Sequence, residues 1–165
     1  QAVSRGLGDV YKRQICNFID TMKIRITKAF DFEAAHALDG YDGKCKDIHG
    51  HSYHLETTFV GMPKTNEKES DCGMVVDFGE VKKVVKTQII PLFDHRLILR
   101  KDSRFQHIAP INERIRLVDY QPTCENMLIE IVGILQEHKP PGTTLVKAFL
   151  RETANSYAEW LAEDN

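Results

Sequence analysis

The chain has 165 residues and a formal net charge of −2, with 42% hydrophobic and 28% charged residues. This composition predicts one ordinary globular domain and excludes a disordered or fibrous chain. Lysine and arginine number 22 against 24 aspartate and glutamate residues. That balance argues against a nucleic-acid-binding protein, which needs a strong basic excess, but it allows a small anionic ligand bound by a local basic patch.

The sequence also carries signals about cellular location. No apolar run approaches the roughly 18 residues of a membrane span, and no segment is typical of a signal-peptide core. The four cysteines form no Cys-x-x-Cys pair, which fits reduced thiols better than a disulfide framework; they are Cys16, Cys45, Cys72 and Cys124. We therefore expect a soluble cytoplasmic protein.

Residues 1–21 differ in character from the rest of the chain. Residues 1–14 show neither strand nor helix periodicity and resemble translated adaptor or vector sequence. We expect residues 1–21 to be a non-native or disordered leader, with Met22 as the native start and residues 22–165 as a single domain.

Alternating apolar and polar residues predict two strands in the first part of that domain. The first covers residues 24–36, and a Gly- and Asp-rich turn at residues 39–47 leads to the second, at residues 49–59. Residues 144–152 and 156–161 predict a hairpin, and residues 115–120 offer a further short strand.

Two amphipathic helices are predicted between these strands. Asp77 with Glu80 three residues later is typical of a capping box, and the helix after it is expected to stop at Pro91. The second helix begins after Thr123 and ends before Pro140. The order strand, strand, helix, helix, strand, strand predicts an α+β fold, with a four-stranded antiparallel sheet covered by two helices on one face.

Three histidines share one face of the first two strands. A lone histidine on an apolar face usually belongs to the core, but His49 and His51 project together, and antiparallel pairing would bring His36 beside them. Three imidazoles with an open fourth position are typical of a catalytic zinc site. His54 lies on the opposite face and is excluded.

Residues outside the two strands suggest acid–base chemistry and ligand binding. Cys45 lies between two lysines in the turn that would hold the metal, and positive charge favours its thiolate. Asp94 could orient the neighbouring His95 as a proton carrier, although an adjacent pair achieves this only in a turn. Glu152 ends an apolar strand face, where its carboxylate needs hydrogen-bond donors that a ligand could supply.

Six blocks in order resemble the 6-pyruvoyltetrahydropterin synthase and 6-carboxytetrahydropterin synthase family. The resemblance covers essentially all of residues 22–165 and rests on FEAAH (32–36), CKDIHGHSY (45–53), GMVVDF (73–78), FDH (93–95), PTCEN (122–126) and ET (152–153). It implies the tunnelling fold, in which subunits of this element order assemble into an oligomeric barrel with active sites at subunit interfaces. A homo-oligomer built on trimers, hexamers included, is the expected assembly.

The resemblance also implies roles for individual residues. It assigns Zn²⁺ binding to three histidines, proton transfer to a cysteine, an aspartate and a histidine, and pterin binding to four further residues, with Glu152 as the anchor of the pterin ring. These sets are His36, His49 and His51; Cys45, Asp94 and His95; and Glu152, Thr123, Cys124 and Glu125. The family often carries Ser or Thr where this chain has Cys124. Candidates for binding the substrate triphosphate are Lys28, Lys44, Lys46 and Arg96.

The spacing between Cys45 and His49 bears on the reaction. Three residues separate them, which resembles the bacterial 6-carboxytetrahydropterin synthases of queuosine biosynthesis, whereas animal-type pyruvoyl enzymes generally have a longer gap. The implied reaction converts 7,8-dihydroneopterin triphosphate to 6-carboxy-5,6,7,8-tetrahydropterin with loss of acetaldehyde and triphosphate. A pyruvoyl-type synthase, another pterin side-chain lyase and a non-catalytic zinc module with Cys45 as fourth ligand stay open as alternatives.

Overall fold

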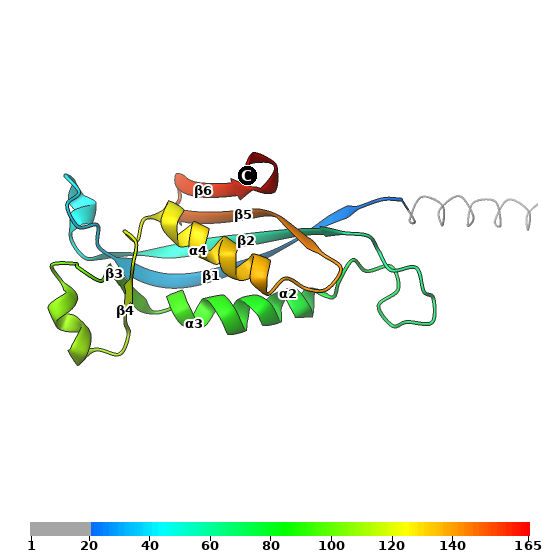
Figure 1. The fold of residues 1–165 in the computed structure, drawn as a ribbon, viewed down its shortest axis with the longest axis horizontal. Coiled ribbons are helices and arrows are strands. Elements are labelled where there is room, and N and C mark those ends of the chain that lie inside the picture. Colours follow the sequence, from blue (N-terminus) through cyan, green and yellow to red (C-terminus); the bar gives the residue numbers. More distant parts are fainter. Residues whose placement is uncertain (1–20) are drawn as a thin grey trace, which may run out of the picture.

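The computed structural model describes residues 21–165 (Figure 1). The leader expected at residues 1–21 lies outside this range except for Thr21. Six strands form one sheet in the order β4-β3-β1-β2-β5-β6. Short 3-10 segments at Lys44–Lys46 (η1), Gln106–Ile111 (η3) and Ala162–Asp164 (η4) lie in the connections and at the C-terminal end.

The longest element is the antiparallel pair of β1 (Ile24–His36) and β2 (His49–Gly61). Their register runs without a break from Ile24 opposite Gly61 to His36 opposite His49. Both predicted strands are confirmed, and so is the pairing that was expected to bring His36 beside the other two histidines. The alternation that predicted the strands also decides which side chains meet, because successive residues point to opposite faces.

The predicted C-terminal hairpin is also confirmed. β5 (Thr144–Thr153) pairs antiparallel with β2 on one side and with β6 (Ser156–Leu161) on the other. This hairpin places the end of β5, and therefore Glu152, near the start of β2.

The prediction of a four-stranded antiparallel sheet is wrong, because the sheet has six strands and is mixed. β3 (Arg96–Arg100) pairs parallel with the end of β1, and β4 (Ile115–Val118) pairs parallel with β3. Residues 115–120 had offered a short strand, but β3 was not predicted. Its apolar centre is only three residues long, and so short a run does not distinguish a strand from a helix.

The first predicted helix is longer than its sequence pattern indicated. α2 (Phe78–Val84) starts at the N-cap Asp77, whose carboxylate accepts a hydrogen bond from the Gly79 amide, and continues through a π-helical turn, Val85–Ile89. α3 (Ile90–Phe93) then carries Pro91 in its first turn. The predicted stop at Pro91 is wrong because a proline is tolerated where its missing N–H has no intrahelical partner.

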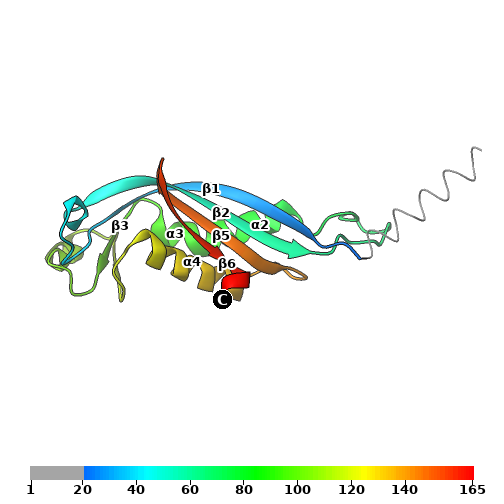
Figure 2. The ribbon, with the colours of Figure 1, turned by 90° about the horizontal axis from the view of Figure 1, so that it is seen from above.

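The second predicted helix is confirmed as α4 (Cys124–Glu137), with the Thr123 hydroxyl as N-cap acceptor for the Asn126 amide. Figure 2 shows the curled sheet arching over α2, α3 and α4, which all cover the same face. The core between these layers has fully buried side chains from both, including Leu55, Val85, Met127 and Ile131. Burial of each such side chain contributes roughly 1.5–3 kcal/mol. Within residues 21–165, no helix has the length and apolarity to cross a membrane.

Candidate active site

The three predicted metal ligands meet at the end of the β1–β2 pair. His36 lies opposite His49, and His51 lies opposite Ala34, so all three rings stand on the face that the helices cover. One ring nitrogen from each histidine lies within 4.8 Å of those of the other two. The Nε2 atoms of His36 and His49 are 3.0 Å apart. His54 points to the opposite face, where its Nδ1 lies 2.6 Å from an Asp31 carboxylate oxygen, and its predicted exclusion is confirmed.

Backbone carbonyls fix the orientation of two of these rings. His36 Nδ1 donates to the Pro122 carbonyl at 2.6 Å, and His49 Nδ1 donates to the Asp47 carbonyl at 2.7 Å. A carbonyl can only accept, so each Nδ1 carries the proton and each Nε2 presents a lone pair. His51 Nε2 is buried and has no hydrogen-bond partner among the described residues. Converging lone pairs and an unsatisfied buried nitrogen fit a divalent metal ion that takes imidazole ligands.

Electrostatics keep this cluster suited to a metal. Burial lowers the pKa of His36 and of His51 below the ordinary histidine value. Both rings are therefore neutral at pH 7, the state in which an imidazole nitrogen can donate a lone pair.

Glu152 brings a carboxylate against the histidines. Its Oε1 lies 3.5 Å from His36 Nε2 and 3.9 Å from His51 Nε2, and it accepts a hydrogen bond of 3.1 Å from the Tyr53 hydroxyl. Burial, with the nearby Glu152 charge, raises the pKa of Tyr53 far above its ordinary value, so the phenol remains a donor. Strand alternation places Tyr53 on the histidine face, but no role was predicted for it; its shared parity with His49 and His51 was the available signal.

Most of the residues predicted to bind substrate line one cavity of about 270 Å³. Cys45 reaches it from η1, Thr123 and Glu125 from the start of α4, and Glu152 from β5. His36 also lines it, which joins the cavity to the histidine cluster. Tyr41 and Tyr157 form part of the wall and were not predicted, although an aromatic residue in the turn before Cys45 was a visible signal.

Cys124 lines this cavity but directs its thiol into the protein. Its S–H donates to the Leu150 carbonyl at 3.3 Å, and burial raises the pKa of the thiol to about 12. The thiol is therefore neutral, and its S–H is engaged in a hydrogen bond with the backbone of β5.

The turn that sequence reasoning required for the second acid–base pair is present after α3. Asp94 Oδ1 lies 2.9 Å from His95 Nδ1 and also accepts a 3.1 Å hydrogen bond from the Glu33 amide. The His95 amide donates to the Glu33 carbonyl at 2.6 Å, and His95 has a φ of 56°, in the left-handed region. These contacts fix the His95 backbone against β1, whereas 67% of its side chain is exposed.

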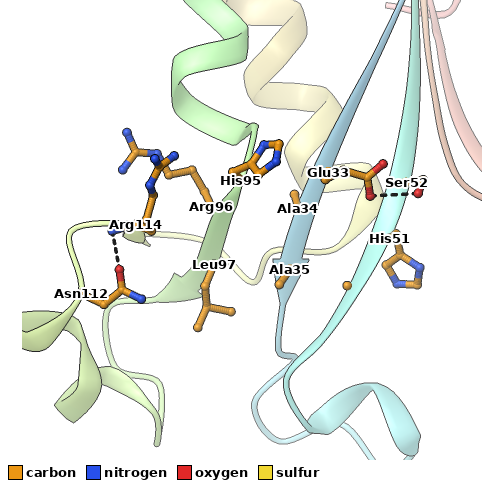
Figure 3. A pocket seen from close by; sticks show the side chains of 11 residues that line it. Glu33, Ala34, Ala35, His51, Ser52, His95, Arg96, Leu97, Asn112 and Arg114 are labelled. Carbon is orange, nitrogen blue, oxygen red and sulfur yellow. Dashed lines mark hydrogen bonds between the residues drawn. The ribbon is translucent and has the colours of Figure 1, made fainter.

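His95 and Cys45 do not share a cavity in the single chain. His95 lines a second cavity, of about 480 Å³, with Glu33, Ala35 and Ser52 (Figure 3). Those side chains alternate along β1 and β2 with the three histidines and therefore point to the other face of the sheet, whereas His51, which also lines this cavity, points to the face that the helices cover. The chain thus brings Asp94 and His95 together, and separately joins Cys45 to the histidine cluster and Glu152.

The candidate cations for the substrate triphosphate are also dispersed. Lys44 and Lys46 flank Cys45 in η1, and the ammonium of Lys28 lies 5.7 Å from the centre of the Phe78 ring. Arg96 lines the His95 cavity.

Comparison with known proteins identifies the family to which this chain belongs. The sequence profile described as 6-pyruvoyl tetrahydropterin synthase matches residues 25–163. The chain belongs to the 6-pyruvoyl tetrahydropterin synthase family. This membership makes it an enzyme of a pterin synthase family, as the resemblance predicted.

Relatives at higher identity have a more specific name. A 6-carboxy-5,6,7,8-tetrahydropterin synthase from Haemophilus influenzae is 32% identical over 142 residues, which are 82% of this chain and 97% of the relative. A protein of the same name from Rickettsia bellii is 34% identical over 143 residues, covering 82% of this chain and 99% of the relative.

Solved structures agree on the fold. The 6-pyruvoyl tetrahydropterin synthase of Caenorhabditis elegans has a TM-score of 0.64 at 22% identity and covers 86% of this chain and 96% of its own. An uncharacterized protein from Wolinella succinogenes has a TM-score of 0.70 at 19% identity, with 86% and 99% covered. At these identities the likeness concerns the fold alone.

Proposed function

We propose that residues 22–165 form a zinc-dependent lyase that converts 7,8-dihydroneopterin triphosphate to 6-carboxy-5,6,7,8-tetrahydropterin, releasing acetaldehyde and triphosphate. The observation that carries this proposal is the cavity that joins Cys45 and Glu152 to the His36 end of a three-histidine cluster. The names of the relatives at 32% and 34% identity support the carboxy product. We place the reaction in cytoplasmic queuosine (7-deazaguanine) biosynthesis.

Zinc is the metal that the donor set favours. His36, His49 and His51 would hold it through ring nitrogens, and three protein ligands leave a position for substrate oxygen. When bound, zinc supplies Lewis acidity that stabilises negative charge developing on a substrate oxygen.

The remaining side chains bind substrate and move protons. Glu152 accepts N–H groups from the guanidine-like edge of the pterin, and Tyr53 holds its carboxylate in place. Thr123 and Glu125 line the same cavity beside that edge. Cys45 and His95 transfer protons on opposite sides of the reacting carbon, and Asp94 orients the His95 ring.

This chemistry requires a second copy of the chain. Cys45 and His95 line different cavities of one chain, so a neighbouring subunit must supply Asp94 and His95 to the cavity of Cys45. β4 and β6 are the outer strands of the sheet, each paired on one side within the described residues. An outer strand is a ready site for pairing with another chain, and we propose a trimer-based barrel assembled in this way.

The test is product identification with zinc-loaded protein and 7,8-dihydroneopterin triphosphate. We expect 6-carboxytetrahydropterin by mass spectrometry together with acetaldehyde, and neither product from a His49→Ala control. A pyruvoyl product, or glycolaldehyde from simple retro-aldol cleavage, would replace the carboxy assignment by another lyase of the family. Unchanged substrate, together with collapse of the fold when zinc is removed, would instead identify a non-catalytic zinc module.

A further inference from the structure

Two arginines line the cavity of His95. Arg96 lies opposite the buried Ala34 in the β1–β3 register, so its side chain leaves the sheet on the side of α3. Arg96 begins β3, and Arg114 precedes β4, so they occupy adjacent positions on neighbouring strands; the Leu97 amide donates to the Arg114 carbonyl at 3.1 Å. The side chains of both line this cavity of about 480 Å³ together with Asn112 (Figure 3).

Arg96 is held in position by uncharged groups. Its Nε donates to the Pro91 carbonyl at 3.3 Å and its Nη1 donates to the Glu113 carbonyl at 2.7 Å. These contacts fix the plane of the guanidinium and neutralise none of its charge. The side chain of Arg114 makes no hydrogen bond or ion pair within residues 21–165, and the Asn112 side-chain oxygen accepts from the Arg114 amide at 2.9 Å.

The charges of both arginines are uncompensated. Some other arginines of the described chain pair with carboxylates, as Arg104 does with Asp47 at 2.7 Å and Arg116 with Glu130. No ion pair among residues 21–165 includes Arg96 or Arg114. The one carboxylate in the cavity wall, Glu33, accepts a 2.9 Å hydrogen bond from the Ser52 hydroxyl.

This arrangement is unfavourable without an anion. Like charges on neighbouring strands repel each other, and a concave surface focuses their field. A ligand with several negative charges would remove the repulsion. Guanidinium groups suit phosphate oxygens best, because their donors match those oxygens in pairs.

We propose that Arg96 and Arg114 bind the triphosphate chain of the substrate. The inference rests on the proposed function, which supplies a triphosphate ester as substrate. It selects Arg96 from the four cations suggested by the sequence and adds Arg114. Because His95 lines the same cavity, phosphates held by the two arginines keep the attached side-chain carbons beside His95. The subunit that donates the proton carrier therefore also holds the phosphates.

The experiment measures binding of sodium tripolyphosphate to the zinc-loaded oligomer by isothermal titration calorimetry, with orthophosphate as a second probe. Arg114→Gln is the principal variant, because its side chain has no partner within the protein to lose. Arg96→Gln is the second variant. Arg25→Gln is the matched control, since Arg25 is another arginine without an ion pair in the described chain and lines a different cavity. Zinc content is measured after each titration because tripolyphosphate also chelates zinc.

We expect tripolyphosphate to bind at least about tenfold more weakly to Arg114→Gln, as for the loss of a charge-assisted hydrogen bond, and unchanged affinity in Arg25→Gln. Unchanged affinity in Arg114→Gln, or an equal loss in Arg25→Gln, would overturn the assignment. Orthophosphate bound as tightly as tripolyphosphate would overturn the assignment to a phosphate chain. If Arg96→Gln melts at a lower temperature than the wild type, Arg114→Gln alone decides the outcome.

The same variants separate this inference from the proposed function. Selective loss of tripolyphosphate binding in Arg114→Gln, with no product from the wild type, would retain the phosphate site and reject the reaction. Normal product formation by Arg114→Gln with an unchanged KM would reject the site and retain the reaction.

Discussion

The separation of Cys45 from His95 leads to a quantitative prediction about mixed oligomers. Glu33, which contacts the His95 backbone, lies three residues before His36 along β1, a distance of about 10 Å at the strand rise. Cys45 lies beyond His36, where its carbonyl accepts from the Leu38 amide at 3.0 Å. A proton carrier must approach the reacting atom to about 2.6–3.2 Å. One chain cannot place both groups at one carbon, because they also line different cavities.

Two inactive variants should therefore restore activity together. Cys45→Ala and His95→Ala are each expected to lower kcat by at least about a hundredfold. In a ring of the two chains mixed at random, each site takes Cys45 from one chain and His95 from its neighbour. Each group is intact in about half of the chains, so about one site in four has both groups intact. Co-expressed chains with different affinity tags, purified through both tags, should recover about a quarter of wild-type activity.

The control uses two lesions on the same side of the interface. Asp94→Asn co-expressed with His95→Ala should stay inactive, because every neighbour then carries one defective member of the pair. Asp94→Asn with Cys45→Ala should recover activity. If co-purified Cys45→Ala and His95→Ala chains show no recovery, both groups act from one subunit and the argument from the two cavities is wrong.

Further predictions concern the metal cluster, the substrate pocket and the buried thiol. His49→Ala should bind zinc at least about a hundredfold more weakly while keeping its circular dichroism spectrum, because the His49 side chain lies at the rim of the sheet; metal analysis after dialysis tests this. Glu152→Gln retains an acceptor for Tyr53 but loses the charge, so KM should rise about tenfold or more in zinc-loaded protein; an unchanged KM would remove Glu152 from pterin binding. Cys124 should resist iodoacetamide at pH 8 under conditions that label the exposed Cys72, because burial raises the pKa of Cys124 to about 12; peptide mass spectrometry would show early labelling if that thiol were reactive. In metal-free protein, burial lowers the pKa of His36, so below about pH 6.5 the unfolded chain binds more protons and stability falls as pH falls. Urea unfolding at pH 5 and pH 8 should show this decrease, and His36→Gln should reduce it.

Part of the candidate site could be predicted because it depends on local periodicity. His36, His49 and His51 share a face through the two-residue repeat of a strand, and the Gly- and Asp-rich turn between the strands allowed only antiparallel return. The same repeat excluded His54. Thr123 predicted the start of α4, because a hydroxyl group before a helical run accepts hydrogen bonds from the free amides of the first turn. Each of these inferences needed only residues close together in the chain.

The π-helical turn shows where local rules were insufficient. Pro91 ends a regular α-helix in sequence analysis, yet the wider turn at Val85–Ile89 moves Pro91 to the first turn of α3. Packing favours the longer helix, because Val85, Ile89 and Phe93 are all fully buried. The free energy of that burial comes from contacts with the sheet, which no local pattern contains.

The sequence by itself determined the family, the strand faces, the helix starts and which three histidines lie together. Only the tertiary structure decided that β3 and β4 join the sheet in parallel beside β1, and that the Cys124 thiol donates to the Leu150 carbonyl. It also decided that Arg96 and Arg114 line one cavity and that neither forms an ion pair within the described residues. It further decided that His95 and Cys45 line different cavities. The physical reason is common to these features: side-chain alternation is a property of neighbouring residues, whereas pairing between distant strands uses backbone groups that every residue carries, so the sequence pattern does not specify the partner.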